Sequence, residues 1–205
     1  MMGAAKSRLP SGYRELKSII STGTQYIQTG IQLDDYNGFE IDAKVSFREN
    51  SGLVGDKSGS TIFSWQGANV FAYWYARNTN SIGTWSRSLG ERHVYRAFNG
   101  EAFFDGEYIL TLTGTKQKGT QGGARIFWGY SSEKPTFANK AVSEVFSCIF
   151  LDANEALVGQ FIPAVRESDN EIGMYDLCGT ICPLTNTPFY INAGTGTFLK
   201  GANVL

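Results

Sequence analysis

Apolar and polar side chains alternate along several short stretches of this chain. Residues 39–47, FEIDAKVSF, carry apolar side chains at the odd positions and polar ones at the even positions. Because the side chains of a strand point alternately to its two faces, this pattern predicts a β-strand with one buried and one solvated face. Aromatic and β-branched residues indicate further strands at residues 61–65, 70–76, 93–104, 107–113 and 124–130.

Turn signals separate these candidate strands. Asp105-Gly106 predicts a hairpin between residues 93–104 and 107–113, because glycine adopts positive φ without steric cost. Such signals recur roughly every 8 to 15 residues, and no long stretch has helical periodicity. The sequence therefore predicts an all-β fold, an antiparallel two-sheet β-sandwich.

Residues 142–163 fit two interpretations. Val142, Val145, Phe146 and Ile149 would line one face of a helix. The same segment is rich in strand-forming residues on both sides of the polar stretch 152–155, Asp-Ala-Asn-Glu. We favour the second interpretation, two strands joined as a hairpin.

Two similar Thr-Gly segments lie near the ends of the chain, at residues 21–24 (STGT) and 194–197 (GTGT). Each is expected to form a turn, the first leading into a strand at 25–31 and the second into Phe198. Tyr26 and Ile31 are expected to be available to the core. The matching turns suggest that the first and last strands lie side by side in one sheet.

Composition indicates one globular domain. The 205 residues are 42% hydrophobic and 18% charged, which is typical of a packed chain. We assign residues 11–205 to a single domain and residues 1–10, which are small and polar, to an N-terminal arm. A net charge of −1 gives no indication of nucleic-acid binding or of attachment to an anionic membrane surface. No segment has the roughly 18–20 apolar residues of a membrane span, and residues 1–19 lack the apolar core of a secretion signal.

The three cysteines do not form a recognisable metal or redox motif. Cys178 and Cys182 are four residues apart, one more than in a C-x-x-C pair, and Cys148 is distant from both. Reduced structural thiols are the expectation, and a disulfide between Cys178 and Cys182 is the alternative.

The segments described above resemble LamG-like, concanavalin A-like jelly-roll domains, a family found in gut bacteria and their phages. The resemblance spans residues 11–201 and departs at residues 177–188, where LCGTICPLTNTP replaces a shorter turn. The matching segments are YREL at 13–16, STGTQYIQTG at 21–30, the alternating strand at 39–47, DG at 105–106, FIPA at 161–164, EIGMYD at 171–176, FY at 189–190 and GTGTF at 194–198.

The resemblance implies a jelly roll whose concave face and edge loops bind glycans, and a phage particle or cell surface as its setting. A virion protein is released by lysis and needs no secretion signal. We therefore expect a non-catalytic virion accessory protein, such as a capsid decoration, fibre or tail component. Its N-terminal arm would contact other virion proteins, and exposed edge strands make homo-oligomers a reasonable expectation. The alternatives are a bacterial cell-surface carbohydrate-binding module and a glycan-cleaving enzyme.

Catalytic motifs are incomplete. The related family-16-type glucanases carry Glu-x-Asp-x-x-Glu on one strand. Glu40 and Asp42 match its start, but Val45 occupies the position of the last glutamate. His93 is the sole histidine and is expected to be structural, so we predict no enzyme and no histidine-based metal site.

Exposed aromatic residues are the best candidates for glycan contacts, because sugar rings pack their C–H faces on aromatic rings. Trp74, Trp85, Arg87 and Tyr95 are the candidate carbohydrate-binding residues, with core packing as the alternative for each aromatic side chain. No cofactor is expected. The one alternative is a calcium ion held by Asp34-Asp35 or by Asp152 and Asn154.

Overall fold

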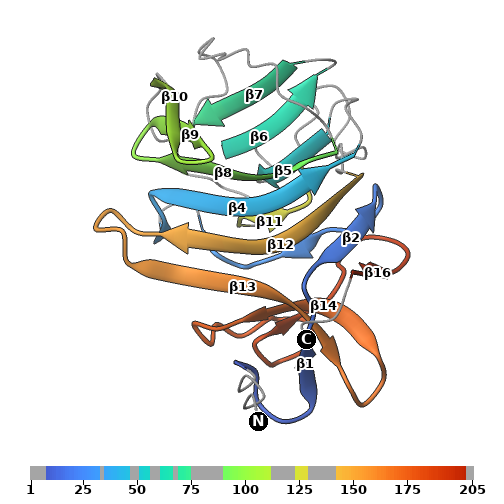
Figure 1. Ribbon diagram of the computed structural model, residues 1–205. Helices are drawn as coiled ribbons and strands as arrows, with labels where there is room; N and C mark the ends of the chain where they lie inside the picture. Colours follow the sequence, from blue (N-terminus) through green and yellow to red (C-terminus); the bar gives the residue numbers. More distant parts are fainter. Residues whose placement is uncertain are drawn as a thin grey trace, which may run out of the picture.

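The computed structural model describes residues 8–32, 35–46, 51–55, 61–66, 69–74, 90–111, 123–128 and 142–201. These residues form strands and turns without an α-helix, and the strands pair in antiparallel fashion within two sheets (Figure 1). The strands are β1 (Tyr13–Glu15), β2 (Ile19–Thr22), β3 (Ile27–Gln28), β4 (Gly38–Val45), β5 (Ser51–Gly55), β6 (Thr61–Gln66), β7 (Asn69–Trp74), β8 (Arg92–Phe98), β9 (Glu101–Phe104), β10 (Glu107–Thr111), β11 (Arg125–Ile126), β12 (Val142–Leu151), β13 (Leu157–Arg166), β14 (Glu171–Asp176), β15 (Phe189–Tyr190) and β16 (Leu199–Lys200).

The larger sheet contains eleven of the described strands. Eight of them follow one another in the order β10-β9-β8-β4-β12-β13-β14-β15. In addition, β1 pairs with β13, β2 pairs with β12, and β16 pairs with β2. The smaller sheet has the order β3-β11-β5-β6-β7. Side chains of both sheets pack into one hydrophobic cluster, in which Ile41 and Phe150 of the larger sheet join Val54 and Ile126 of the smaller one. The two sheets therefore stack face to face as a β-sandwich.

Strand β4 has the alternation that its sequence predicts. Phe39, Ile41, Ala43 and Val45 are at most 1% exposed, whereas the polar residues between them are partly exposed. We call the face of the larger sheet that carries Glu40, Asp42 and Lys44 the outer face, because it lies opposite the core.

The hairpin interpretation of residues 142–163 is confirmed. Strands β12 and β13 pair from Cys148↔Phe161 to Leu151↔Leu157, and the turn between them contains Asp152. The Asp105-Gly106 hairpin is also confirmed, with φ of 48° and 81° at the two turn residues. Residues 93–104, expected as one stretch, are divided into β8 and β9 by a second turn of the same kind at Asn99-Gly100, with φ of 47° and 81°.

The two Thr-Gly segments lie side by side, as their similarity suggests. The Thr195 amide donates to the Thr24 carbonyl at 3.1 Å, and the Thr24 hydroxyl donates to the Thr195 carbonyl at 2.9 Å. Beyond these turns β16 pairs with β2, with Leu199 opposite Ile20. Gly194 is required here because a Cβ atom at this position would collide with the Thr24 carbonyl oxygen.

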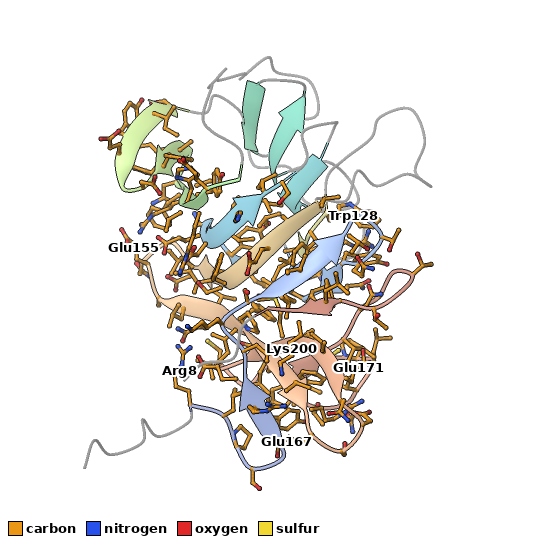
Figure 2. The ribbon with its side chains drawn as sticks, turned by 45° about the vertical axis from the view of Figure 1, so that its right-hand side comes forward. Arg8, Trp128, Glu155, Glu167, Glu171 and Lys200 are labelled. Atoms are coloured by element: carbon orange, nitrogen blue, oxygen red, sulfur yellow. The ribbon has the colours of Figure 1, made fainter. Side chains whose placement is uncertain are left out.

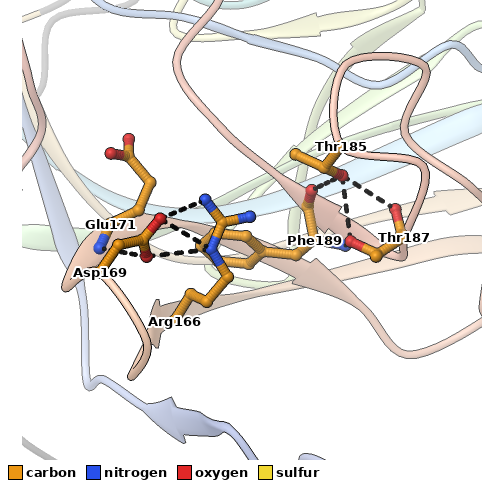
Figure 3. A network of polar contacts seen from close by, with 6 residues as sticks. All are labelled: Arg166, Asp169, Glu171, Thr185, Thr187 and Phe189. Carbon is orange, nitrogen blue, oxygen red and sulfur yellow. Dashed lines mark hydrogen bonds and ion pairs between the residues drawn. The ribbon is translucent and has the colours of Figure 1, made fainter.

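The segment 177–188 is fixed to the sheet at both of its ends. The Asp176 carboxylate is fully buried and accepts hydrogen bonds from the amides of Gln160 at 2.8 Å, Cys178 at 3.0 Å and Thr180 at 3.2 Å. At the other end the Thr185 hydroxyl donates to the Phe189 carbonyl at 2.6 Å (Figure 3). The segment is therefore an ordered loop held by backbone and side-chain hydrogen bonds.

Part of the expected N-terminal arm belongs to the folded domain. Leu9 is 8% exposed and packs with Ile162, Ala164 and Phe189 in a second, smaller hydrophobic cluster. Arg8 forms an ion pair with Glu15 of β1. Leu9 is thus packed against the sheet between the exposed residues Arg8 and Pro10, and residues 1–7 of the arm lie outside the described part of the chain.

Candidate functional site

The outer face of the larger sheet carries the charged residues of two neighbouring strands. Glu40 and Asp42 project from β4, and Arg92 and Arg96 project from β8. The antiparallel register places Arg96 directly opposite Glu40 and Arg92 on the diagonal from Asp42. Opposite charges at such positions attract each other across the strand pair.

Arg92 is held by a carboxylate and an aromatic ring. Its Nε donates to Asp42 Oδ1 at 2.8 Å and its terminal nitrogen donates to Asp42 Oδ2 at 2.5 Å, a bidentate pair. The guanidinium carbon lies 3.9 Å from the centroid of the Phe146 ring on β12. The hydrogen bonds to Asp42 raise the pKa of the Arg92 guanidinium above its ordinary value. Arg92 is therefore a fixed cation whose remaining N–H groups can donate to a ligand.

Arg96 has a similar environment. It donates to Glu155 Oε2, in the β12–β13 turn, at 2.9 Å and lies 3.9 Å from Glu40. Its guanidinium carbon is 5.2 Å from the centroid of the Phe98 ring and 6.0 Å from that of Phe103. Both arginines thus combine a carboxylate partner with an aromatic neighbour.

Two hollows lie on this face. One, of about 480 Å³, is lined by residues of β4, β8, β9 and the β12–β13 turn, including Glu40, Arg96 and Phe103. The other, of about 560 Å³, is lined by residues of β1, β4, β8, β12 and β13, including Asp42 and Phe146. Glu40 lines both hollows, so they adjoin. We call the two hollows together the outer groove. In Figure 2, Glu155 and Arg8, which line its two parts, lie on the same side of the molecule.

The structure places one predicted glycan contact in the core. Tyr95 is 3% exposed, and its ring packs edge-on against Phe104 with the centroids 5.2 Å apart. Burial raises the pKa of its hydroxyl well above the ordinary value. This corrects the expectation for Tyr95, because a buried ring cannot stack on a sugar. Trp74 ends β7, whose side chains are outside the described part of the structure, and Trp85 and Arg87 lie outside the described residues altogether.

The groove residues were not selected from the sequence. Phe146 was considered only as part of a helix face or as a strand-forming residue. In the structure a bulge between Val145 and Ser147 interrupts the pairing of β12 with β4. Val145 and Cys148 are both buried, so the two residues between them are partly exposed and line the second hollow. The alternation of Arg92, Val94 and Arg96 along β8 was a usable signal for a shared outward face.

A second aromatic cluster lies on the smaller sheet. The Trp128 ring packs edge-on against Tyr26 with the centroids 4.6 Å apart, and the Arg125 guanidinium carbon lies 4.2 Å from the Trp128 ring centroid. Trp128 is partly exposed, and Figure 2 shows it on the side of the molecule opposite Glu155. This cluster is therefore separate from the outer groove.

The residues with catalytic potential occupy other roles in the structure. Val45, at the place of the third glucanase acid, is 1% exposed and faces the core, away from Glu40 and Asp42. His93 Nδ1 is 2.8 Å from Asp105 Oδ2, and its ring packs on Phe104 at a centroid distance of 4.3 Å. His93 thus joins strand β8 to the β9–β10 turn at Asp105.

Where the structure describes them, the candidate calcium ligands accept hydrogen bonds from backbone amides close to them in the sequence. Asp152 Oδ1 accepts hydrogen bonds from the amides of Asn154 at 2.7 Å and Ala156 at 2.9 Å, which stabilise its own turn. Asp35 Oδ2 accepts from the Gln32 amide at 3.1 Å, and Asp34 lies outside the described residues. Within the described ranges, no three His, Cys, Asp or Glu side chains are grouped so as to hold a metal ion.

The cysteines are free thiols in very different environments. Cys148 and Cys182 are buried, whereas Cys178 is exposed, so the alternative of a Cys178–Cys182 disulfide is not observed. Burial raises the pKa of Cys148 well above its ordinary value. Desolvation raises the pKa of Cys178 as well, with a contribution from the charge of Asp176.

We expect only Cys178 to react when the folded protein is titrated with a thiol reagent, and all three cysteines to react in denaturant. Since the thiolate is the nucleophile, the reaction rate of Cys178 should still increase with pH where a free cysteine is already fully ionised. Mass spectrometry of the labelled peptides identifies the site. Fast labelling of Cys148 or Cys182 in the native protein would contradict the described packing.

Together, the fold and the groove define this chain as an antiparallel β-sandwich with a charged and aromatic surface groove on its larger sheet. Comparison of the sequence with protein-family models and with curated proteins finds no match. Among the described residues, none forms a helix of the length and apolar character that crossing a membrane requires.

Proposed function

We propose that this protein is a non-catalytic accessory protein of a phage particle that binds glycan chains in the outer groove. The observation that carries the glycan part is the arrangement of Arg92 and Arg96, each with a carboxylate partner and an aromatic neighbour, along two adjoining hollows. Such an arrangement is suited to polyhydroxyl ligands. Carboxylate oxygens accept hydrogen bonds from sugar hydroxyls, and guanidinium N–H groups donate to hydroxyl oxygens.

The aromatic residues support the same ligand class. Phe103 and Phe146 are partly buried residues that line the first and second hollows respectively. Sugar rings have apolar C–H faces that pack on such surfaces, while their hydroxyls satisfy the surrounding polar groups. The non-catalytic part of the proposal rests on the incomplete Glu-x-Asp-x-x-Glu motif, because Val45, at the position of its last glutamate, faces the core.

The particle setting rests on the resemblance to jelly-roll domains of gut bacteria and their phages. The jelly-roll connectivity of the two sheets is part of this proposal. Leu9 and Arg8 lie next to β1 and β13, so the contact of the N-terminal arm with other virion proteins would be made near these strands. Co-purification of the chain with assembled phage particles tests this part. Its absence from particles, combined with glycan binding by the free protein, would support the cell-surface module instead.

The glycan part is tested on an array of bacterial and mucosal glycans, followed by calorimetric titration with the strongest ligand. Arg96→Ala should weaken binding about tenfold or more, since it removes donors from the groove. Arg166→Ala is the matched control, because Arg166 also pairs with an exposed carboxylate, Asp169, and lies 5.4 Å from an aromatic ring centroid, that of Phe189, outside the groove.

Three results would contradict the proposal. Absence of binding to any glycan would exclude the glycan function. An equal loss of affinity in Arg166→Ala would exclude the outer groove as its location, and so would a loss confined to Trp128→Ala on the opposite side. Thermal unfolding of each variant shows whether the fold is retained.

A further inference from the structure

We infer that the outer groove selects uncharged glycan chains and rejects acidic ones. This inference rests on the proposed function and adds the chemical class of the ligand. It depends on the charges that line the groove and on how the arginines among them are already paired. The lining includes five carboxylates, Glu15, Glu40, Asp42, Glu101 and Glu155, and four cations, Arg8, Lys17, Arg92 and Arg96.

The first hollow is negatively charged. Glu40, Glu101 and Glu155 line it together with one cation, Arg96. A sugar that carries a carboxylate or a sulfate would bring a further negative charge among these groups. Like charges at close range in a partly desolvated site disfavour binding.

The arginines of the second hollow are already matched with carboxylates. Arg92 forms its bidentate pair with Asp42, and Arg8 donates two hydrogen bonds to Glu15. An acidic sugar could reach only the remaining N–H groups of an arginine whose charge is already matched. Its own charge would then lie close to the bound carboxylate, and the repulsion between the two anions would offset most of what the new hydrogen bonds contribute.

An uncharged sugar brings no such repulsion. A guanidinium has five N–H donors, of which a bidentate carboxylate uses two, and each carboxylate oxygen has a second lone pair. Hydroxyl groups can therefore bind the guanidinium and the carboxylate of one pair at the same time. Because Glu40 lines both hollows, a linear chain can make such contacts along the whole groove.

The test begins with an array that contains neutral, uronate, sialylated and sulfated glycans. We expect the bound glycans to be uncharged. The strongest ligand is then compared by calorimetry with its own derivative in which primary hydroxyls are oxidised to carboxylates. The oxidised form should bind at least about tenfold more weakly, and the difference should decrease at high salt.

The variant Glu155→Gln tests the effect of charge alone, because it removes one negative charge from the first hollow and keeps a side chain of similar size. The Glu155 side chain is 58% exposed, so the substitution should preserve the fold, and it removes the closer carboxylate partner of Arg96. The ratio of the affinity for the oxidised ligand to the affinity for the neutral ligand should increase about threefold to tenfold, whatever the substitution does to the two affinities in common. Glu167→Gln is the control, because Glu167 is exposed and lies outside the groove, far from Glu155 in Figure 2.

The outcomes separate the two proposals. If no glycan binds, both the proposed function and this inference are wrong. If glycans bind but the strongest ligands are acidic, or if oxidation improves binding, the inference is wrong and the glycan function remains. If Glu155→Gln changes discrimination no more than Glu167→Gln does, the charge of the groove is not its cause.

Discussion

Phe150→Ala is expected to lower the free energy of unfolding by about 3–5 kcal/mol, the usual cost of removing a fully buried aromatic side chain. Phe150 is completely buried between the sheets. Its ring packs edge-on against Tyr36, with centroids 5.1 Å apart, and against Phe161, with centroids 5.9 Å apart. The cavity left by the substitution would therefore be surrounded by rigid rings that cannot close it easily.

The measurement is equilibrium unfolding in urea. Tyr108→Ala is the control, since Tyr108 is an aromatic residue of the same sheet with 55% of its surface exposed, and its loss should cost less than about 1 kcal/mol. Similar midpoints for the two variants would show that the sheets do not pack through Phe150.

Asp176→Ala is expected to have the second large effect, a loss of about 3 kcal/mol or more. It would leave the amides of Gln160, Cys178 and Thr180 without their acceptor, and buried donors without a partner cost about 1–3 kcal/mol each. Because two of these amides belong to the segment 177–188, the loop should also open locally. Thiol labelling at Cys178 should then be faster than in the unaltered protein.

Asp176→Asn and Asp169→Ala are the controls for this prediction. Asparagine keeps one acceptor oxygen and should recover part of the loss. Asp169 is an exposed aspartate that accepts hydrogen bonds from Arg166 and from the Glu171 amide, and its removal should cost much less. If Asp169→Ala destabilises the protein as much as Asp176→Ala, burial is not what makes Asp176 important.

The fold could be predicted from the sequence wherever one face of a strand is buried and the other is exposed to solvent. Strand β4 shows this clearly, since its alternation fixed which residues reach the core. The hairpin between β12 and β13 followed from the polar residues at its turn. The Asn99-Gly100 turn was missed, although Asn-Gly is a strong hairpin signal, because aromatic and β-branched residues flank it continuously from His93 to Phe104.

The candidate site could be predicted only in part. Alternation places Tyr95 and Arg96 on opposite faces of β8, but it does not say which face meets the core. That is decided by the pairing of Tyr95 with Ile41, a contact between residues far apart in the sequence. The position of Phe146 depends on a bulge, which has no signature in a single sequence. Glu155 contacts Arg96 from the β12–β13 turn, 59 residues further along the chain, and nothing in the sequence between them indicates that contact.

The pairing of β16 with β2 has a consequence for how the chain folds during its synthesis on the ribosome. The edge of β2 that faces β16 has no partner until some 180 further residues have been synthesised. The same delay applies to the turn at Thr24, which depends on Thr195. We therefore expect the nascent chain to acquire protease resistance only after residues 199–200 have left the ribosome, and a chain that stops before residue 190 to expose an unpaired strand edge prone to association.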